Sequence, residues 1–137
     1  MRTQAEYMAL LAHAREARER AYAPYSRFAV GAAALTASGR IFPGCNVENA
    51  AYPACVCAER IALLSAYAAG ERDIVALAIV ADTPGPASPC GACRQVLLEI
   101  APRCAVVLAN MRGETLITTP GELLPGGFTA ESLPERS

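Results

Sequence analysis

The sequence predicts an α/β protein with a mixed sheet. Three observations predict this class: an amphipathic N-terminal segment, two β-type runs joined by a short turn, and a later alternation of helical and apolar extended segments. The chain has 137 residues, of which 53% are hydrophobic. A chain of this size and composition is expected to form a single domain, residues 1–137, with enough apolar material for a core.

The first half of the chain predicts one helix and one hairpin. Thr3 and Glu6 have the spacing of a capping box, and apolar residues follow at helical intervals. His13, the only histidine, is expected on the exposed face of this helix. The runs F-A-V-G-A-A-A-L and R-I-F-P-G-C flank a turn at 37–39, which predicts an antiparallel hairpin over about 28–45.

The second half predicts two helices that alternate with two strands. The helices are expected over 58–69 and 91–100, and the strands over 74–80 and 105–108. Both strands are continuously apolar, which is typical of strands covered on both faces. The alternation predicts that they are parallel with right-handed crossovers, so the helix starts meet at the sheet edge where such folds bind ligands.

Two segments are expected to lack regular structure. Residues 82–89 are rich in proline and glycine and lead into a cysteine, which favours a rigid connecting loop. Residues 129–137 are expected to form a loosely held tail.

Composition excludes several classes of function. The chain has no lysine, which excludes Schiff-base chemistry and a P-loop, and any catalytic triad would depend on His13. Twelve arginines are scattered among thirteen acidic residues, so nucleic-acid binding is not expected. Because the sequence shows no membrane span and no signal peptide, we expect a cytoplasmic protein that is not bound to a membrane. Its six cysteines are then better explained by free thiols and a metal than by disulfides.

Four residues carry the strongest chemical signal. Cys57, Cys90 and Cys93 are three candidate thiolate ligands for Zn²⁺, and three protein ligands leave the fourth tetrahedral position for water. Glu59 follows Cys57 by two residues, so it is poorly placed to be a ligand but well placed to bond that water. The pattern predicts one catalytic zinc ion per chain, with Glu59 as proton carrier.

The local sequence also predicts how the charge of such a site is offset. Zinc with three thiolates carries one net negative charge, and the starts of the two helices at residues 58 and 91 would both face it. We expect Arg60, beside Cys57, to donate hydrogen bonds to thiolate sulfur. Arg94 is instead interpreted as a solvated surface arginine.

One alternative metal site remains open from the residues alone. Cys55 with the other three cysteines would give four thiolates and a closed structural zinc site, which would leave Glu59 without a role. Cys104, within C-A-V-V-L-A, is expected to be a small buried hydrophobic residue.

The sequence closely resembles the small cytidine deaminases that bind zinc through three cysteines, and the match runs almost from end to end. This resemblance implies a three-layer α/β/α, cytidine-deaminase-like fold with a mixed, roughly five-stranded sheet. The blocks that carry it are A-Y-A-P-Y-S-R-F (21–28), G-C-N-V-E-N-A-A-Y (44–52), C-A-E-R (57–60), P-C-G-A-C-R-Q (89–95) and E-L-L-P-G-G-F (122–128).

The resemblance implies hydrolysis of cytidine and deoxycytidine to uridine and deoxyuridine with release of ammonia, a reaction of pyrimidine salvage. Zinc would acidify a water molecule, and Glu59 would take its proton, deliver one to ring N3 and later one to the departing amine. The backbone at Cys57 and Ala58 would bond the pyrimidine edge.

Further family positions imply how the substrate is held. Asn46 and Glu48 match a ribose-contacting pair, although a turn residue and a solvated acid would explain them equally well without the resemblance. A carboxylate accepts a hydrogen bond from a free 3′-hydroxyl but repels a phosphodiester. Glu48 therefore favours a free nucleoside.

The same resemblance implies a homotetramer with shared active sites. Phe28 and Phe128 match aromatic positions that wall the pyrimidine, and Phe128, Ala50 and Tyr52 match positions contributed by neighbouring subunits. Core packing is the ordinary explanation for an isolated aromatic residue. The apolar composition and a mean hydropathy of +0.25 permit such an assembly.

Two other functions fit part of the pattern. A blasticidin S deaminase, or a deaminase of related aminopyrimidines, would share C-A-E and P-C-G-x-C-R-Q, whereas the N-V-E-N-A-A-Y segment favours cytidine. A non-enzymatic, zinc-stabilised binding module would require Cys55 as a ligand and would not require Glu59.

Overall fold

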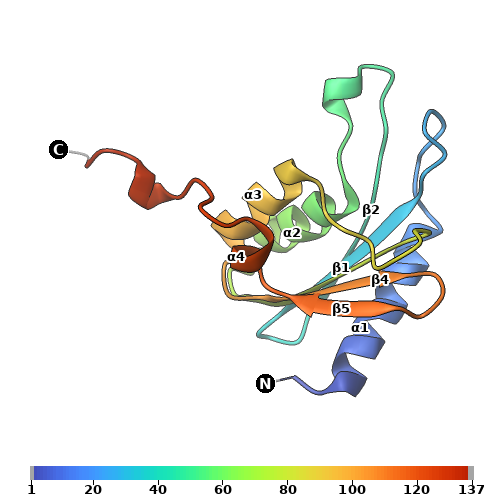
Figure 1. Ribbon diagram of the computed structural model, residues 1–137, viewed down its shortest axis with the longest axis horizontal. Coiled ribbons are helices and arrows are strands. Elements are labelled where there is room, and N and C mark those ends of the chain that lie inside the picture. The colour runs from blue at the N-terminus through green and yellow to red at the C-terminus, as the bar shows by residue number, and fades with distance from the viewer. Residues whose placement is uncertain (1, 136–137) are drawn as a thin grey trace.

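The computed structural model describes residues 2–135. A five-stranded sheet forms the middle layer, with strand order β2-β1-β3-β4-β5. Helix α1 lies on one face of this sheet, and α2 and α3 lie on the other (Figure 1). The α/β class and the three-layer arrangement are therefore as predicted.

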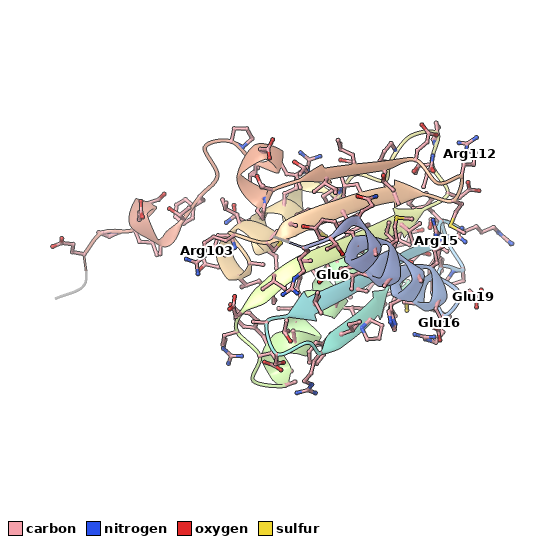
Figure 2. The ribbon with its side chains drawn as sticks, turned by 90° about the horizontal axis from the view of Figure 1, so that it is seen from below. Glu6, Arg15, Glu16, Glu19, Arg103 and Arg112 are labelled. Carbon is pink, nitrogen blue, oxygen red and sulfur yellow. The ribbon has the colours of Figure 1, made fainter. Side chains whose placement is uncertain are left out.

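Helix α1 spans Gln4–Arg18 and begins with the predicted capping box. The backbone N–H of Glu6 donates to the hydroxyl of Thr3 at 3.2 Å, and the Glu6 carboxylate accepts from the Thr3 N–H at 3.2 Å. The helix buries Leu10 and Leu11 against the sheet, and Figure 2 shows it lying across this face with its charged side chains outward. His13 is exposed, as expected.

The predicted hairpin consists of β1 (Val30–Thr36) and β2 (Ile41–Cys45), which pair antiparallel. Gly39 lies in the connecting turn with φ of 91°, a left-handed conformation that glycine adopts without steric cost. Strand β2 is at the edge of the sheet, where Pro43 is tolerated because no partner needs its missing N–H.

The predicted alternation in the second half is confirmed. Helix α2 (Ala58–Ala68) precedes β3 (Ile74–Ala81), and α3 (Gly91–Ile100) precedes β4 (Ala105–Asn110). Strands β3 and β4 are parallel, whereas β3 pairs antiparallel with β1, which makes the sheet mixed.

Four short elements lay outside the positions expected from the local pattern. Strand β5 (Thr115–Thr118) pairs antiparallel with β4 and completes the five strands, and α4 (Pro120–Leu123) follows it. Single 3₁₀ turns occur at Tyr52–Ala54 and Ala130–Ser132.

The apolar core lies on both faces of the sheet. Along β3, the side chains of Leu77, Ile79 and Ala81 pack with α2 and α3, while those of Ala76, Ala78 and Val80 pack with α1. This alternation explains why the sequence of the strand is continuously apolar, since both of its faces are covered.

Two glycines allow close approach of the helices to the hairpin. A Cβ added at Gly31 would lie 1.9 Å from the carbonyl oxygen of Ala14 in α1. A Cβ added at Gly44 would lie 2.4 Å from the carbonyl oxygen of Ala58 and 2.7 Å from the backbone nitrogen of Ala62, both in α2. Gly44 thereby sets the depth at which the start of α2 lies against the sheet.

The C-terminal segment extends away from the rest of the molecule (Figure 1). Its described part, 129–135, contains the second 3₁₀ turn and is largely exposed, while the end of the tail prediction, residues 136–137, lies outside the described residues. Within 2–135, none of the helices has both the length and the apolar character needed to cross a bilayer.

Candidate functional site

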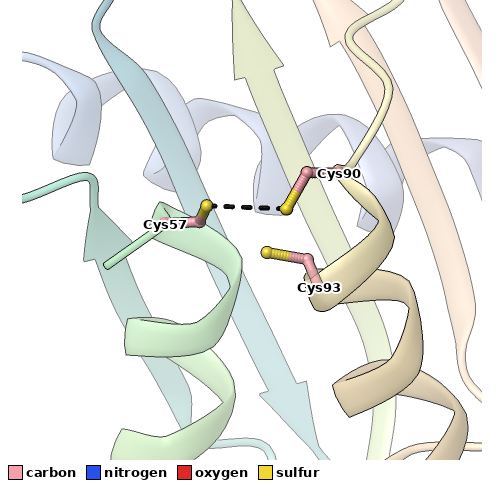
Figure 3. Close-up of side chains that lie close together, drawn as sticks. All are labelled: Cys57, Cys90 and Cys93. Atoms are coloured by element: carbon pink, nitrogen blue, oxygen red, sulfur yellow. Dashed lines mark hydrogen bonds between the residues drawn. The ribbon is translucent and has the colours of Figure 1, made fainter. Parts of the chain in front are cut away.

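Three cysteine side chains meet where two helices begin. Cys57 is the N-cap of α2 and Cys90 is the N-cap of α3, each with extended backbone, and Cys93 lies in the first turn of α3. Figure 3 shows their sulfur atoms converging from the two helices. The predicted arrangement of both helix starts toward one point is thus present, and it directs the positive ends of two helix dipoles at the thiolates.

The geometry of this cluster fits a zinc ion. The three Sγ atoms lie within 4.8 Å of one another, and Cys57 Sγ is 3.7 Å from Cys90 Sγ. Tetrahedral coordination with Zn–S bonds of ~2.3 Å requires sulfur atoms ~3.8 Å apart. Cys93 is buried whereas Cys90 is exposed, so the cluster is closed on one side and open on the other.

Arg60 makes the contact expected from its position. Its Nη2 donates to Cys57 Sγ at 3.6 Å. The hydrogen bond from Cys93, followed by those from Arg60 and Cys90, lowers the pKa of Cys57 to about 5 against the opposing effect of burial. The hydrogen bond to Cys57, burial and the nearby Glu59 raise the pKa of Cys93. In the metal-free protein, negative charge is therefore concentrated on Cys57.

Glu59 is buried beside the cluster. Only 4% of its surface is exposed, and it lines the same cavity as Cys57 and Cys90. Burial and the negative charge of Cys57 raise the pKa of its carboxyl group, although the helix backbone and Cys93 oppose this. A buried carboxyl group with a raised pKa is suited to exchange protons, which is the role that the sequence predicts.

A cavity of about 260 Å³ opens in front of the cluster. This volume lies near the lower end of the range for small-molecule sites. The predicted site residues that line it are Phe28, Asn46, Glu48, Cys57, Ala58, Glu59 and Cys90.

Three predicted substrate residues lie outside this cavity. Ala50, Tyr52 and Phe128 are exposed, and the exposed fractions of the two aromatic side chains are 69% and 57%. Tyr52 instead lines a second cavity with Tyr25, and the two rings meet edge to face with centroids 6.0 Å apart. Within one chain, these three residues do not line the cavity in front of the cysteine cluster.

The proposed ribose pair is held by backbone groups. Asn46 Oδ1 accepts from the N–H of Val30 at 2.8 Å, and its Nδ2 donates to the carbonyl of Phe28 at 2.7 Å. Glu48 Oε1 accepts from the N–H groups of Tyr25 and Ser26 at 3.0 and 3.1 Å. Glu48 is therefore not a freely solvated acid, and Asn46 is not merely a turn residue, since its side chain bonds backbone groups 16 and 18 residues away.

The four-thiolate alternative is not supported by the structure. Among the described residues, the cysteine cluster that can hold a metal contains Cys57, Cys90 and Cys93 but not Cys55. The sulfur of Cys55 instead accepts from the N–H of Asn49 at 3.3 Å. Cys104 is 1% exposed, which confirms its prediction as a buried apolar residue.

The interpretation of Arg94 as a solvated surface residue was wrong. Its Nε donates to the carbonyl of Pro89 at 2.9 Å, Nη1 donates to the carbonyl of Leu123 at 2.6 Å, and Nη2 donates to the hydroxyl of Ser88 at 2.6 Å. Two of these partners, Ser88 and Pro89, lie in the loop before Cys90, and the third, Leu123, lies in the C-terminal segment. Arg94 therefore ties that loop to the C-terminal segment.

Several cavity residues were missed by sequence reasoning. Ile79 and Ala81 lie at the carboxyl end of β3, the sheet edge where a site was expected, so strand position alone could have indicated them. Thr83, Ala87 and Ser88 come from the loop that leads into Cys90, and Ser26 comes from the conspicuous A-Y-A-P-Y-S-R-F block.

Comparison with known proteins points to one family. The family model described as the cytidine and deoxycytidylate deaminase zinc-binding region matches residues 3–109. The cytidine deaminase of Halalkalibacterium halodurans is 54% identical over 125 residues, covering 90% of this chain and 95% of that protein. The cytidine deaminase of Sporosarcina psychrophila is 52% identical over 125 residues, covering 90% and 92%.

The structure of this chain is also similar to solved structures of cytidine deaminases. A crystal structure of cytidine deaminase from Burkholderia pseudomallei has a TM-score of 0.88 at 54% identity, covering 93% of this chain and 100% of that one. That of cytidine deaminase from Mycobacterium tuberculosis has a TM-score of 0.77 at 40% identity, covering 90% and 97%. With its three-thiolate cluster and adjacent buried glutamate, the chain belongs to the zinc-binding cytidine and deoxycytidylate deaminase family.

Proposed function

We propose that this protein is a zinc-dependent enzyme that hydrolyses free cytidine and deoxycytidine to uridine and deoxyuridine with release of ammonia. The observation that carries the proposal is the buried carboxyl group of Glu59 beside three convergent thiols, in a cavity sized for a small molecule. Family membership supports the same reaction.

Cys57, Cys90 and Cys93 would hold the zinc ion, because their number and spacing fit three of its four tetrahedral positions. When bound, the ion supplies a Lewis acid that makes a water molecule acidic near neutral pH. Arg60 offsets thiolate charge through its hydrogen bond to Cys57, which keeps the site a better Lewis acid than three uncompensated thiolates would be.

Glu59 carries the protons of the reaction. It removes one proton from the attacking water and delivers it to ring N3 as oxygen adds to C4 of the pyrimidine. It then takes the second proton of that oxygen and passes it to the amine, so the C4–N bond breaks, ammonia leaves and a carbonyl remains. Burial of the carboxyl group suits both steps, since a raised pKa favours the protonated form that each delivery requires.

The remaining cavity residues hold the nucleoside. Backbone N–H groups at the start of α2, near Ala58, have no helical partner and can donate to the pyrimidine edge. Glu48, whose pKa is lowered by its hydrogen bonds with Ser26 and Tyr25, remains an ionised acceptor for the 3′-hydroxyl of the sugar. Asn46 supports the same side of the cavity, and Phe28 stacks on the pyrimidine.

We further propose that the chain, a single domain over residues 1–137, assembles as a homotetramer with shared active sites. Ala50, Tyr52 and Phe128 are exposed and outside the chain's own cavity, which supports their contribution to a neighbouring subunit's site. The reaction returns a pyrimidine nucleoside for reuse, so we assign it to cytoplasmic pyrimidine salvage.

A substrate panel on the zinc-loaded protein tests the proposed function. Uridine and ammonia should appear in equal amounts from cytidine, with about one zinc ion per chain, and cytidine 3′-monophosphate should be a poor substrate because the Glu48 carboxylate would repel a phosphate at the 3′ position. Faster turnover of blasticidin S than of either cytidine or deoxycytidine would contradict the substrate assignment. Absence of turnover for the whole panel would contradict the enzymatic function.

A further inference from the structure

A serine outside the predicted site holds the carboxylate of Glu48. The hydroxyl of Ser26 donates a short hydrogen bond to Glu48 Oε2, while the backbone N–H groups of Ser26 and Tyr25 donate to Oε1 at 3.1 and 3.0 Å. Both oxygens of the carboxylate therefore have a fixed donor. Each oxygen also retains acceptor capacity, since a carboxylate oxygen can accept more than one hydrogen bond.

The same hydroxyl is bonded to the residue that walls the cavity. The backbone N–H of Phe28 donates to Ser26 Oγ at 3.0 Å. A serine hydroxyl has one hydrogen, and when this hydrogen is used on Glu48 the oxygen lone pairs are available to Phe28. Ser26 is thus hydrogen-bonded to both Glu48 and Phe28, and all three residues line the cavity of about 260 Å³.

The backbone between these contacts adopts an unusual conformation. Arg27 has φ of 59°, and it is the one non-glycine residue with positive φ among the described residues. Its N–H donates to the carbonyl of Ala23 at 2.9 Å, which closes a turn that brings the N–H of Phe28 back to the Ser26 hydroxyl. Such conformations persist where the surrounding contacts determine them, and they are concentrated at functional sites.

Ser26 also decides the direction in which the carboxylate can act. Ser26 and Glu48 line both the cavity in front of the cysteines and the second cavity, of about 320 Å³, beside Tyr52. Without the hydroxyl, the Glu48 side chain keeps its backbone donors on one oxygen but loses the donor that fixes the other. The carboxylate would then be free to turn toward the second cavity.

We propose that Ser26 is a positioning residue that holds Glu48 as an acceptor for the 3′-hydroxyl, and so sets the preference of the enzyme for nucleosides that carry this group. The inference rests on the proposed function and extends it to sugar recognition. Ser26 does not contact the reacting atoms in this account, so its removal should weaken binding and leave the chemical step unchanged.

The test compares the zinc-loaded Ser26→Ala variant with wild type on cytidine and 3′-deoxycytidine. We expect the KM for cytidine to rise about tenfold with kcat within about twofold, as for loss of one hydrogen bond to a charged group. The KM for 3′-deoxycytidine should change by less than about twofold, since this substrate lacks the 3′-hydroxyl that would donate a hydrogen bond to Glu48. Discrimination between the two substrates should therefore fall about tenfold.

Two further variants separate positioning from general damage. Ser26→Thr keeps the hydroxyl and should recover most of the discrimination. Ser38→Ala removes a matched serine–glutamate hydrogen bond, from Ser38 Oγ to Glu71 Oε1 at 2.5 Å, in the hairpin turn at the opposite end of β1. This control should leave both KM values unchanged.

Equal losses on both substrates, or an unchanged KM for cytidine in Ser26→Ala, would overturn the inference. Calorimetric binding of uridine and 3′-deoxyuridine gives the same comparison without turnover, and the variant should again lose selectivity for uridine. If wild type binds uridine selectively, Ser26→Ala loses that selectivity, and wild type releases no ammonia from cytidine, the proposed function fails while the role of Ser26 stands. If wild type does not distinguish the two ligands, the role of Ser26 fails, whatever the turnover.

Discussion

The guanidinium of Arg60, in the first turn of α2, donates a hydrogen bond over 3.6 Å to the sulfur of Cys57, the N-cap of the same helix. A candidate zinc ligand and its charge partner are thus placed by one rigid element, three residues apart. This relationship limits the negative charge that three thiolates place on a bound metal, because a charged donor draws electron density from the sulfur.

Arg60→Ala should weaken catalysis through this contact. We expect kcat/KM for cytidine to fall about tenfold to 100-fold, the usual range for loss of such a partner, with a measurable fall in zinc affinity. Steady-state kinetics and a competition assay with a zinc chelator measure the two effects. Arg103→Ala, at an exposed position after α3, is the matched control. If Arg60→Ala behaves like that control, Arg60 has no role at the metal.

Gly44→Ala should displace α2 from the hairpin. The added methyl group would lie 2.4 Å from the backbone oxygen of Ala58, and backbone cannot yield as a flexible side chain can. We expect the free energy of unfolding to fall by about 1–3 kcal/mol, and zinc affinity to fall with it because α2 carries Cys57. Gly121→Ala adds the same group with no neighbouring atom within 4 Å and serves as control in denaturant titrations. Equal stability of the two variants would refute the packing argument.

Arg94→Ala should release the loop before Cys90 from the C-terminal segment. Three hydrogen bonds are lost, to Pro89, Leu123 and Ser88, and we expect a destabilisation of about 2–3 kcal/mol after allowance for solvent at this partly exposed side chain. Thermal unfolding of the zinc-loaded protein measures this effect. Hydrogen exchange should increase at residues 120–128, and an unchanged exchange pattern there would show that Arg94 does not anchor the segment.

Removal of zinc should expose Cys57 as a reactive cysteine. Neighbouring donors lower the pKa of Cys57 to about 5, so its thiolate predominates at pH 7 in the metal-free protein. Alkylation by iodoacetamide at Cys57 should therefore be rapid at pH 7 and should slow as the pH falls through about 5. Burial raises the pKa of Cys104 to about 12, so that residue should stay unmodified. Mass spectrometry locates the label, and prior loading with zinc should prevent it. Equal labelling of Cys57 and Cys104 would contradict this electrostatic account.

Local sequence patterns predicted most of the architecture because those elements are defined by burial or capping. Strand β3 is apolar throughout since α1 and the pair α2 and α3 cover its two faces, and α1 begins at a capping box that is visible in the sequence. Strand β5 gave no such signal. It lies at the sheet edge, with Leu116 and Ile117 exposed, so its sequence is not shaped by a covering layer.

The site was predictable where the chemistry requires a particular residue type at a particular spacing. Cys57, Cys90 and Cys93 were candidates from zinc preferences, but only the structure separates Cys55 from their cluster. Ser26 and Arg94 could not be identified from the sequence, because their partners are fixed by the fold: Glu48 is 22 residues from Ser26, and the carbonyl of Leu123 is 29 residues from Arg94. A backbone carbonyl leaves no trace in the sequence, so an arginine that bonds to it resembles a solvated one.

In the proposed mechanism, Glu59 is a proton carrier beside the metal and not a ligand to it. Turnover of cytidine and bound zinc should therefore be measured on the same sample of the Glu59→Gln variant. We expect about one zinc ion per chain, as in wild type, with kcat lower by at least about 10²-fold to 10⁴-fold. Turnover near that of wild type would contradict the proposed mechanism, and loss of zinc would show that Glu59 serves the metal site itself.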